Sequence, residues 1–122
     1  MNKTAIGGSN EQKAADYLKS RGHEILTMNY RCKDGEIDII SRDGAYLVFT
    51  EVKYRSSTEF GRPSDAVDYK KKKRVSNAAY FYTVTHGLGA DTPVRFDVVV
   101  LSGQSIAHYP GAFAYCGRKN IF

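Results

Sequence analysis

Two apolar runs joined by a tight turn constrain this fold more than any other part of the sequence. Residues 35–40 and 46–53 are rich in β-branched and aromatic residues, and Arg42-Asp43-Gly44 lies between them. An Asp-Gly pair between two such runs is a strong signal for a β-hairpin. If Asp43 and Gly44 are the two turn residues, Arg42 pairs with Ala45 and the register of the whole hairpin follows. The sequence therefore predicts an antiparallel hairpin.

This register would gather charged side chains on one face of the hairpin. Glu36 would lie opposite Glu51, Asp38 would lie diagonally from Glu51, and Lys53 would share their face because strand side chains alternate. Charges among apolar strand residues are costly unless they are paired or bind a metal. A solvated network of cross-strand ion pairs is the structural alternative, but apolar residues on both faces of these strands favour cover by helices. Asp38 and Glu51 are therefore candidate metal ligands.

The expected metal follows from the chemistry of these side chains. Carboxylate oxygens suit Mg²⁺ or Mn²⁺, which keep coordination positions open for water and phosphate oxygens. Such an ion offsets phosphate charge and lowers the pKa of bound water. Lys53 could orient or help to deprotonate that water and stabilise the charge that develops on phosphorus. Glu36 is either a further ligand or the partner of a lysine.

Two helices are predicted, one before and one after these strands. The first is capped by Ser9 or Asn10, runs to about Arg21 and stops at Gly22. Its apolar stripe consists of Ala14, Ala15 and Leu18. Glu11 lies on this stripe, where it either serves the site or is simply a negative charge favoured at a helix start.

The second predicted helix carries a strongly basic segment, residues 70–74. It is capped by Ser64 or Asp65, runs to about His86 and stops at Gly87. Its apolar stripe consists of Val67, Val75, Ala78, Ala79 and Tyr82. Lys71 follows this stripe by helical spacing, so it is expected to point inward, toward phosphate or a site carboxylate.

Basic residues in and before this helix are candidate nucleic-acid contacts. A basic run is usually a solvated helix face, and phosphate contact is the more specific interpretation for Lys71 and Arg74. Arg55 and Arg62 belong to a polar loop over residues 54–63 that is either a phosphate grip or an ordinary mobile loop. The net charge of +5 also favours an anionic partner, most commonly nucleic acid.

The remaining pattern predicts the fold class. Further strands are expected at residues 24–30 and 94–101, with a short fifth strand after the turn at 102–104; no assignment is made from Pro110 onward. Asp97 is expected to be structural and to pair either near Arg95 or with a helix lysine. The prediction is one α/β domain over residues 1–122, a mixed sheet flanked by helices in the order α-β-β-β-α-β(-β).

Several function classes are disfavoured by composition. Cys32 and Cys116 form no CxxC motif and have no zinc-like spacing with histidines, so reduced structural thiols are expected. The first residues lack the apolar core of a signal peptide, and no apolar run reaches membrane-spanning length. A cytoplasmic protein without a membrane partner is expected.

Together these motifs resemble the PD-(D/E)xK nuclease superfamily, which has a restriction-endonuclease-like core. More closely, the chain resembles the bacterial YraN family, which is similar to archaeal Holliday-junction resolvases. The resemblance extends from about Gly7 to Leu101. It rests on Glu11 with Ala14, Ala15 and Leu18, on Asn29-Tyr30-Arg31, Gly35-Glu36-Ile37-Asp38, Phe49-Thr50-Glu51-Val52-Lys53-Tyr54-Arg55 and Gly61-Arg62-Pro63, and on Lys71.

The resemblance implies roles for individual residues. It implies Asp38 and Glu51 as ligands of Mg²⁺ or Mn²⁺, Lys53 as the catalytic lysine and Glu11 as a helix-borne acid near the metal. One departure is Asn10, which stands where the family usually has glycine. Asparagine tolerates left-handed backbone better than most residues, so a turn at this position would still be accessible.

Three functions are consistent with these features. The first is a metal-dependent endonuclease that hydrolyses DNA phosphodiester bonds, with branched or junction DNA among its candidate substrates. The others are a nucleic-acid-binding module without catalysis and a subunit that needs a partner to complete its site. A role on junctions would suit a homodimer, because a four-way junction presents symmetric strands.

Overall fold

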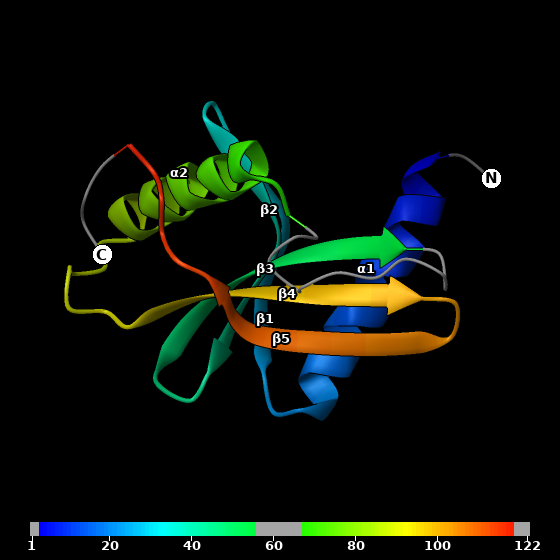
Figure 1. Cartoon of the computed structure of the whole chain (residues 1–122). Helices are drawn as coiled ribbons and strands as arrows, with labels where there is room; N and C mark the ends of the chain where they lie inside the picture. Colours follow the sequence, from blue (N-terminus) through cyan, green and yellow to red (C-terminus); the bar gives the residue numbers. More distant parts are fainter. Residues whose placement is uncertain (1–2, 56–66, 119–122) are drawn as a thin grey trace.

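One five-stranded sheet carries a helix on each of its two faces (Figure 1). The computed structural model describes residues 3–55 and 67–118, and only the backbone of residues 3–9. The elements are α1 (Lys3–Ser20), β1 (Glu24–Cys32), β2 (Gly35–Asp43), β3 (Tyr46–Arg55), α2 (Tyr69–Thr85), β4 (Val94–Ser102) and β5 (Ser105–Phe113). This order confirms the predicted α-β-β-β-α-β-β arrangement. The fifth strand is longer than predicted, because it continues through Pro110.

The sheet is mixed, and its one parallel pair places α2. The spatial order is β1-β2-β3-β4-β5; β3 and β4 are parallel, whereas the other neighbours are antiparallel. A parallel pair needs a long crossover connection, and the chain between β3 and β4 contains α2. The crossover therefore holds α2 against the sheet, where it packs mainly on β2.

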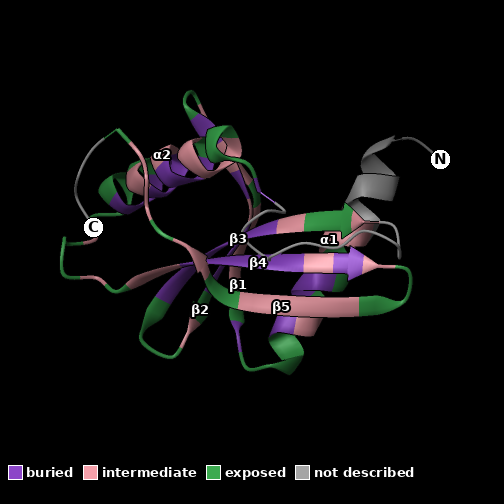
Figure 2. Cartoon of the chain, viewed as in Figure 1, coloured by how far each residue is buried: buried purple, intermediate pink, exposed green. Residues whose placement is uncertain are grey.

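Each face of the sheet buries its own apolar cluster. Consecutive residues Ile39 and Ile40 are both fully buried and belong to different clusters, as alternation along a strand requires. The α1 face joins Ala14, Ala15 and Leu18 to Ile39, Val99 and Leu101. The α2 face joins Val75, Ala78, Ala79 and Tyr82 to Ile37, Ile40, Leu47, Phe49 and Phe96. Figure 2 shows these buried residues along the inner faces of the helices and the middle strands. Both predicted helix stripes are buried, although Val67 precedes α2 and packs with Val98.

Both helices begin at positions other than the predicted caps. Because α1 begins at Lys3, Ser9 and Asn10 lie inside it. The cap of α2 is Asp68, whose carboxylate accepts a hydrogen bond from the Lys71 backbone N–H at 2.8 Å. Several short polar residues near a helix start can act as caps, and only the backbone path decides which one faces the free N–H groups. The alternative caps Ser64 and Asp65 lie outside the described residues. The stops at Gly22 and Gly87 are confirmed, because both glycines have positive φ, 96° and 67°.

The β2–β3 hairpin is shifted by one residue from its predicted register. Asp43 pairs with Tyr46, so the loop residues are Gly44 and Ala45. Gly44 has a φ of 60° and occupies the first loop position, where a type II′ hairpin favours glycine. The predicted pairing of Glu36 with Glu51 is therefore wrong. The regular ladder ends at the pair Ile39–Thr50.

Gly35 lets α2 approach the sheet at the start of β2. A Cβ atom at this position would lie 1.9 Å from the Arg74 carbonyl oxygen, a backbone atom of α2. Any larger residue would push the helix away from the strand. The close contact fixes the height of α2 above Glu36, the next residue in β2.

Two further expectations concern the cysteines and membranes. Cys32 and Cys116 are free thiols, as predicted. Neither α1 nor α2, the helices of the described residues, is long and apolar enough to cross a membrane.

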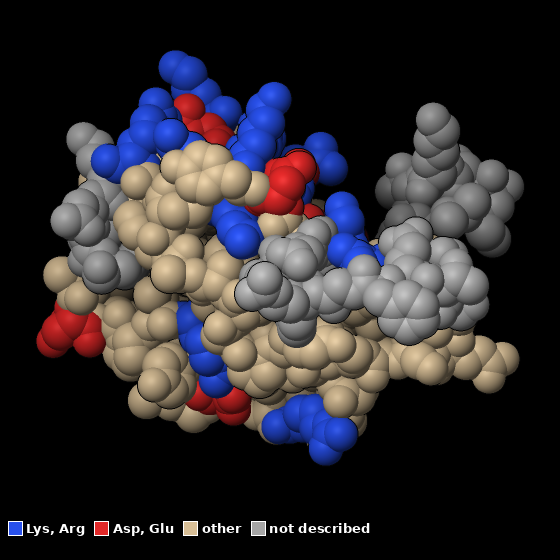
Figure 3. Space-filling view, viewed as in Figure 1, with Lys and Arg blue, Asp and Glu red and all other residues tan. Residues whose placement is uncertain are grey.

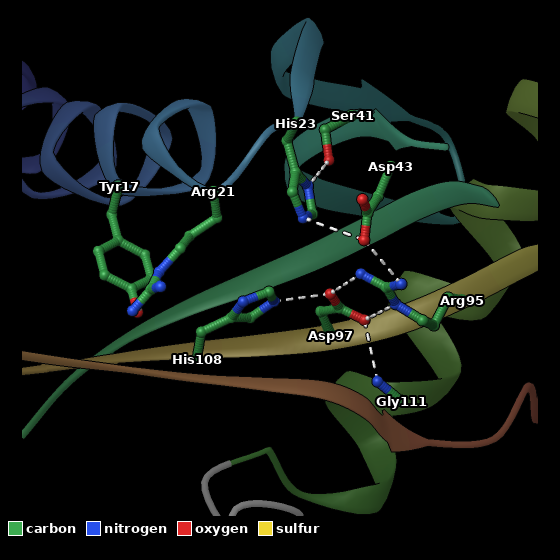
Figure 4. Close-up of polar contacts among 9 residues, drawn as sticks. All are labelled: Tyr17, Arg21, His23, Ser41, Asp43, Arg95, Asp97, His108 and Gly111. Atoms are coloured by element: carbon green, nitrogen blue, oxygen red, sulfur yellow. Dashed lines mark hydrogen bonds and ion pairs between the residues drawn. The ribbon is translucent and has the colours of Figure 1, made fainter. Parts of the chain in front are cut away.

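A buried polar network ties β4 to β2 and β5 on the α1 face of the sheet (Figure 4). Asp97 is fully buried and accepts two hydrogen bonds from Arg95, each of 2.9 Å. It accepts others from His108 Nε2 at 2.8 Å and from the Gly111 backbone at 3.0 Å. Burial alone would raise the pKa of Asp97, but these hydrogen bonds outweigh it and lower the pKa. Arg95 also pairs with Asp43 at 3.0 Å, so the predicted structural role of Asp97 is confirmed.

Asp97→Asn is expected to lower the free energy of unfolding by about 3 kcal/mol, because it breaks a buried charge pair and leaves Arg95 and His108 short of an acceptor. Urea denaturation at pH 7 measures the change. The control is Asp91→Asn, at an exposed aspartate before β4, which should leave stability within about 0.5 kcal/mol. Equal stability of the two variants would contradict the structural role of the network.

Candidate active site

The candidate active site lies where β2 and β3 separate. Beyond the pair Ile39–Thr50 no further β2–β3 pairs form, and Asp38 Oδ2 accepts a hydrogen bond from the Val52 backbone N–H at 2.8 Å. The side chain of Asp38 thus takes the place of a missing backbone partner. This contact holds the carboxylate in the gap between the two strands.

The neighbouring strand β1 is distorted at the same level. Met28 pairs with Ile39 and Tyr30 pairs with Ile37, while Asn29 between them has a φ of 55°. Left-handed backbone at a residue other than glycine costs on the order of 1–3 kcal/mol and is common at functional sites. The irregular backbone of β1 therefore coincides with the position of Asp38 in β2.

Glu51 brings a second carboxyl group to this gap. Its residue is only 4% exposed, and its Oε1 atom has no hydrogen-bond partner in the described part of the chain. Burial raises the pKa of Glu51 to about 9, and the charge of Asp38 contributes to the rise. Without a metal, Glu51 therefore carries a proton at neutral pH. Two adjacent ionised carboxylates repel each other unless one of them is protonated or a cation binds both. This pair therefore suits a divalent cation.

Lys71 covers the carboxyl groups from the α2 side. Its Nζ lies 3.2 Å from Glu36 Oε1 and 3.7 Å from Glu51 Oε2. Burial alone would lower the pKa of Lys71, but the nearby carboxylates outweigh burial and raise it. Lys71 therefore attracts both acids, and its shorter contact is the one with Glu36. Lys71 thus points inward, as its helical spacing predicts.

Glu36 forms ion pairs with three cations. Besides Lys71, Arg31 Nε lies 3.8 Å and Arg74 Nη2 lies 3.9 Å from its carboxylate oxygens. The hydrogen bond and the charge of Lys71 lower the pKa of Glu36. Of the two predicted alternatives for Glu36, the described contacts correspond to pairing with a lysine.

Glu11 approaches the site from α1, on the opposite face of the sheet. Burial raises the pKa of Glu11, and the charge of Asp38 raises it further, while a hydrogen bond donated by the Asn29 side chain opposes the shift. Glu11 is therefore close enough to Asp38 to feel its charge. Asn10 has no positive φ and belongs to α1, so no left-handed turn precedes Glu11.

Asn29 is a site residue that sequence reasoning missed. Its backbone is left-handed and its side chain contacts Glu11. The available signal was weak, because asparagine merely tolerates this conformation better than other residues. The motif Asn29-Tyr30-Arg31 lies in a strand, where an alternating pattern predicts regular backbone.

The predicted basic residues are placed differently from one another. Lys53 is exposed, and its charge acts on Glu51, whose pKa it lowers slightly against the larger rise. Arg55 is half-buried at the end of β3, and Arg74 is exposed on α2. Arg62 lies outside the described residues. The structure thus brings Glu11, Glu36, Asp38, Glu51 and Lys71 to one place.

The donor set for a cation consists of the Asp38 and Glu51 carboxyl groups. Among the side chains of residues 10–55 and 67–118, no three His, Cys, Asp or Glu are arranged to hold a metal ion. A small hard cation does not need three protein ligands, because Mg²⁺ keeps several waters and is often bound by one or two carboxylates together with phosphate oxygens. The unpaired Glu51 oxygen beside Asp38 fits that mode of binding.

Charged side chains surround this place on the surface. Figure 3 shows lysine and arginine gathered over α2 and the β1–β2 hairpin, with acidic side chains between them. A cavity of about 570 Å³ lies elsewhere, at the start of β4 and the end of β5, and includes Pro93, Phe96 and Phe113. Lys71, Arg31 and Arg74 thus place positive charge beside the acidic side chains on the α2 side of the sheet.

Comparison with known proteins finds relatives of this chain within one protein family. A family model described as "Uncharacterised protein family UPF0102" matches residues 10–101. A UPF0102 protein of Lachnoclostridium phytofermentans is 46% identical, over 93% of this chain and 96% of its own length. UPF0102 proteins of Clostridioides difficile and Thermodesulfovibrio yellowstonii are 43% and 40% identical, each over 93% of this chain and at least 99% of their own length. None of these names states an activity.

Glu51→Gln is expected to stabilise the metal-free protein at pH 8 by about 2 kcal/mol. Because the pKa of Glu51 is raised to about 9, the folded protein holds a proton that the unfolded chain releases above about pH 4.5. The contribution of Glu51 to stability is therefore complete at acidic pH and is lost as the pH rises toward 9. Urea denaturation in EDTA between pH 5 and pH 9 should show a flatter profile for Glu51→Gln. The control is Glu24→Gln, which changes an exposed glutamate of β1. Parallel profiles of stability against pH for wild type and Glu51→Gln would refute the raised pKa of Glu51.

Proposed function

The chain belongs to the uncharacterised protein family UPF0102, and we propose that it is a metal-dependent endonuclease of the PD-(D/E)xK superfamily that hydrolyses DNA phosphodiester bonds. One observation carries the proposal. The buried Glu51, which has an oxygen atom without a hydrogen-bond partner, lies beside Asp38 where β2 and β3 stop pairing. The exposed Lys53 follows two residues later in β3. A purely structural ion-pair network would instead leave each buried carboxylate oxygen with a donor.

Each residue has a distinct task in the proposed reaction. Asp38 and Glu51 would hold Mg²⁺ or Mn²⁺, and Asp38 is kept in position by the Val52 N–H. When bound, the cation offsets the charge of the phosphate and lowers the pKa of the attacking water. Lys53 shares the face of Glu51, so its ammonium group can orient that water and stabilise negative charge at phosphorus.

Two further residues would act through the metal ligands. Lys71 contacts Glu51 at 3.7 Å and Glu36 at 3.2 Å, so it positions the Glu51 carboxyl group and adds positive charge near the phosphate. Glu11 lies within electrostatic range of Asp38 and is held by Asn29. Glu11 is a positioning residue in this proposal, because its contact with the reacting atoms would run through Asp38 or a water.

The basic surface supports DNA as the substrate. Arg31 and Arg74 flank Glu36 on the side from which Lys71 also reaches the site. Protein cations of this kind bind the phosphate backbone by displacing condensed counterions. Contacts with phosphates fix the position of a duplex without reading its sequence, which accords with cleavage directed by the shape of a branch or junction. Such a symmetric substrate would also suit a homodimer.

A second function is favoured by a separate observation. The basic face would bind nucleic acid without any chemistry, and Asp38 and Glu51 are only two protein donors for a cation. The chain would then be a nucleic-acid-binding module, or a subunit that completes its site with a partner. Cleavage and metal binding together separate these functions from a nuclease.

Wild-type protein is expected to cleave DNA in Mn²⁺ or Mg²⁺, and Lys53→Ala should reduce the rate at least about 100-fold because the ammonium group no longer acts on the attacking water or the phosphate. A labelled panel of single-stranded, duplex, flap and four-way-junction DNA, with RNA as comparison, measures the rate and the preferred substrate. Isothermal titration with Mn²⁺ should show binding that Asp38→Asn and Glu51→Gln each weaken at least about tenfold.

The matched controls are Lys19→Ala and Glu24→Gln, which change an exposed lysine and an exposed glutamate outside the site. Cleavage that persists in Lys53→Ala at the wild-type rate would indicate a contaminating nuclease. Mn²⁺ binding that is unchanged in both carboxylate variants would refute the proposed metal site. DNA binding without cleavage in any metal would favour the binding module or the partner-dependent subunit.

Arg74→Ala is expected to weaken DNA binding to a similar degree on all sequences and to reduce the slope of log K against log salt by about 1, because one phosphate contact is lost. Fluorescence anisotropy between 50 and about 200 mM salt measures this slope. Lys19→Ala, in the last turn of α1, should leave the slope unchanged. An unchanged slope in Arg74→Ala would show that Arg74 of α2 makes no phosphate contact.

A further inference from the structure

An open cavity lies on the α1 face of the sheet, at the end where β3 and β4 finish. Its volume is about 340 Å³, and its lining includes Asn10, Lys13, Tyr54, Leu101, Gln104 and Ile106. Pockets that bind small ligands have volumes of roughly 300–1,000 Å³. The cavity therefore has room for one nucleotide but not for a double helix.

The floor of this cavity is a row of side chains across three strands. Tyr54 pairs with Leu101 in the parallel β3–β4 ladder, and Leu101 pairs with Ile106 in β5. Leu101 is buried at 3% exposure, whereas Tyr54 is 59% exposed. Tyr54 therefore presents an uncovered aromatic ring beside an apolar surface, and aromatic rings of this kind stack with nucleobases.

The opposite wall of the cavity is polar. Asn10 and Lys13 come from α1, and Gln104 comes from the β4–β5 turn. An amide side chain can donate to and accept from the edge of a base, and a lysine can pair with a phosphate. Base, phosphate and amide contacts are thus offered within one small cavity, a combination suited to a nucleotide.

The cavity and the candidate active site share two elements, β3 and α1. Tyr54 directly follows Lys53 in β3, and Asn10 directly precedes Glu11 in α1. Consecutive Cα atoms are about 3.8 Å apart, and alternation along β3 sends Lys53 to the α2 face and Tyr54 to the α1 face. Val52 packs in the α1-side cluster, in agreement with this alternation. Lys53 and Tyr54 therefore lie on opposite faces of the sheet, and the cavity shares the α1 face with Glu11.

We propose that this cavity receives one unpaired nucleotide of a DNA strand bound by this chain, with its base stacked on Tyr54 and its phosphate paired with Lys13. The inference rests on the proposed nuclease function, since it names the kind of DNA that the site selects. A base must leave its duplex stack before it can reach Tyr54, so unpaired positions in flaps, gaps or junctions would bind better than intact duplex. Tyr54 is a specificity-determining residue in this proposal.

A fluorescent base analogue tests the proposal without any cleavage. DNA with 2-aminopurine at an unpaired position next to a duplex is titrated with the full chain in EDTA, and the same DNA with the analogue base-paired is the comparison. Stacking on Tyr54 should quench the unpaired analogue. Tyr54→Ala should abolish this quenching and weaken binding of the unpaired probe about fivefold or more, whereas Tyr54→Phe should retain both. Duplex binding should change less than about twofold in either variant.

The matched control is Tyr46→Ala, because Tyr46 is an exposed tyrosine at the other end of β3, with 45% exposure. It should leave the quenching unchanged, and Lys13→Ala should weaken binding of the unpaired probe while the quenching at saturation persists. Equal quenching by wild type and Tyr54→Ala would overturn the proposal, as would an equal loss of duplex binding. Quenching that depends on Tyr54 in a protein that cleaves nothing would support the cavity and refute the nuclease. Cleavage that is lost in Lys53→Ala, together with quenching that is unchanged in Tyr54→Ala, would support the nuclease and refute the nucleotide site in the cavity.

Discussion

The burial of Glu51 beside Asp38 is the constraint around which the rest of this structure is arranged. Two carboxyl groups in an apolar sheet repel each other when both are ionised, so the metal-free protein keeps a proton on Glu51. The strands β2 and β3 part at this level, and Asp38 instead binds the Val52 backbone. A regular ladder would leave no room for this arrangement. The sheet thus gives up backbone pairing at the point where its acids converge.

The surrounding elements supply positive charge from one side and a further acid from the other. Gly35 allows α2 to approach β2 closely, which brings Lys71 within reach of both Glu36 and Glu51. Glu11, on α1 across the sheet, is close enough to Asp38 for the charge of Asp38 to raise the pKa of Glu11. Because α1 and α2 cover opposite faces, only a gap between strands can expose one acid pair to both helices. Because β2 and β3 separate here, the site combines Glu11 from α1 with Lys71 from α2.

The fold and the members of the site were largely predictable, because both depend on local periodicity. The stripes of Ala14, Ala15 and Leu18 and of Val75, Ala78 and Ala79 follow helical spacing, and they are buried against the two faces of the sheet. The inward direction of Lys71 follows from the same spacing. The hairpin register was not predictable to one residue, since Asp-Gly and Gly-Ala loops are both acceptable turn sequences and differ only in which backbone position must have positive φ. The helix caps were not predictable either, because several short polar residues near each helix start can act as caps.

The sequence by itself determined the kinds of side chain and their approximate faces. Glu51 and Lys53 share a face through strand alternation, and Lys71 lies one helical turn before Val75 of the α2 stripe. Only the tertiary structure decided how these groups interact, because burial and distance control charge. It placed Lys71 on Glu36, gave Asn29 its left-handed backbone beside Glu11, and left a Glu51 oxygen without a donor. It also set Tyr54 beside Leu101 and Ile106, a grouping that exists only once β3 has paired with β4, which is distant from it in sequence.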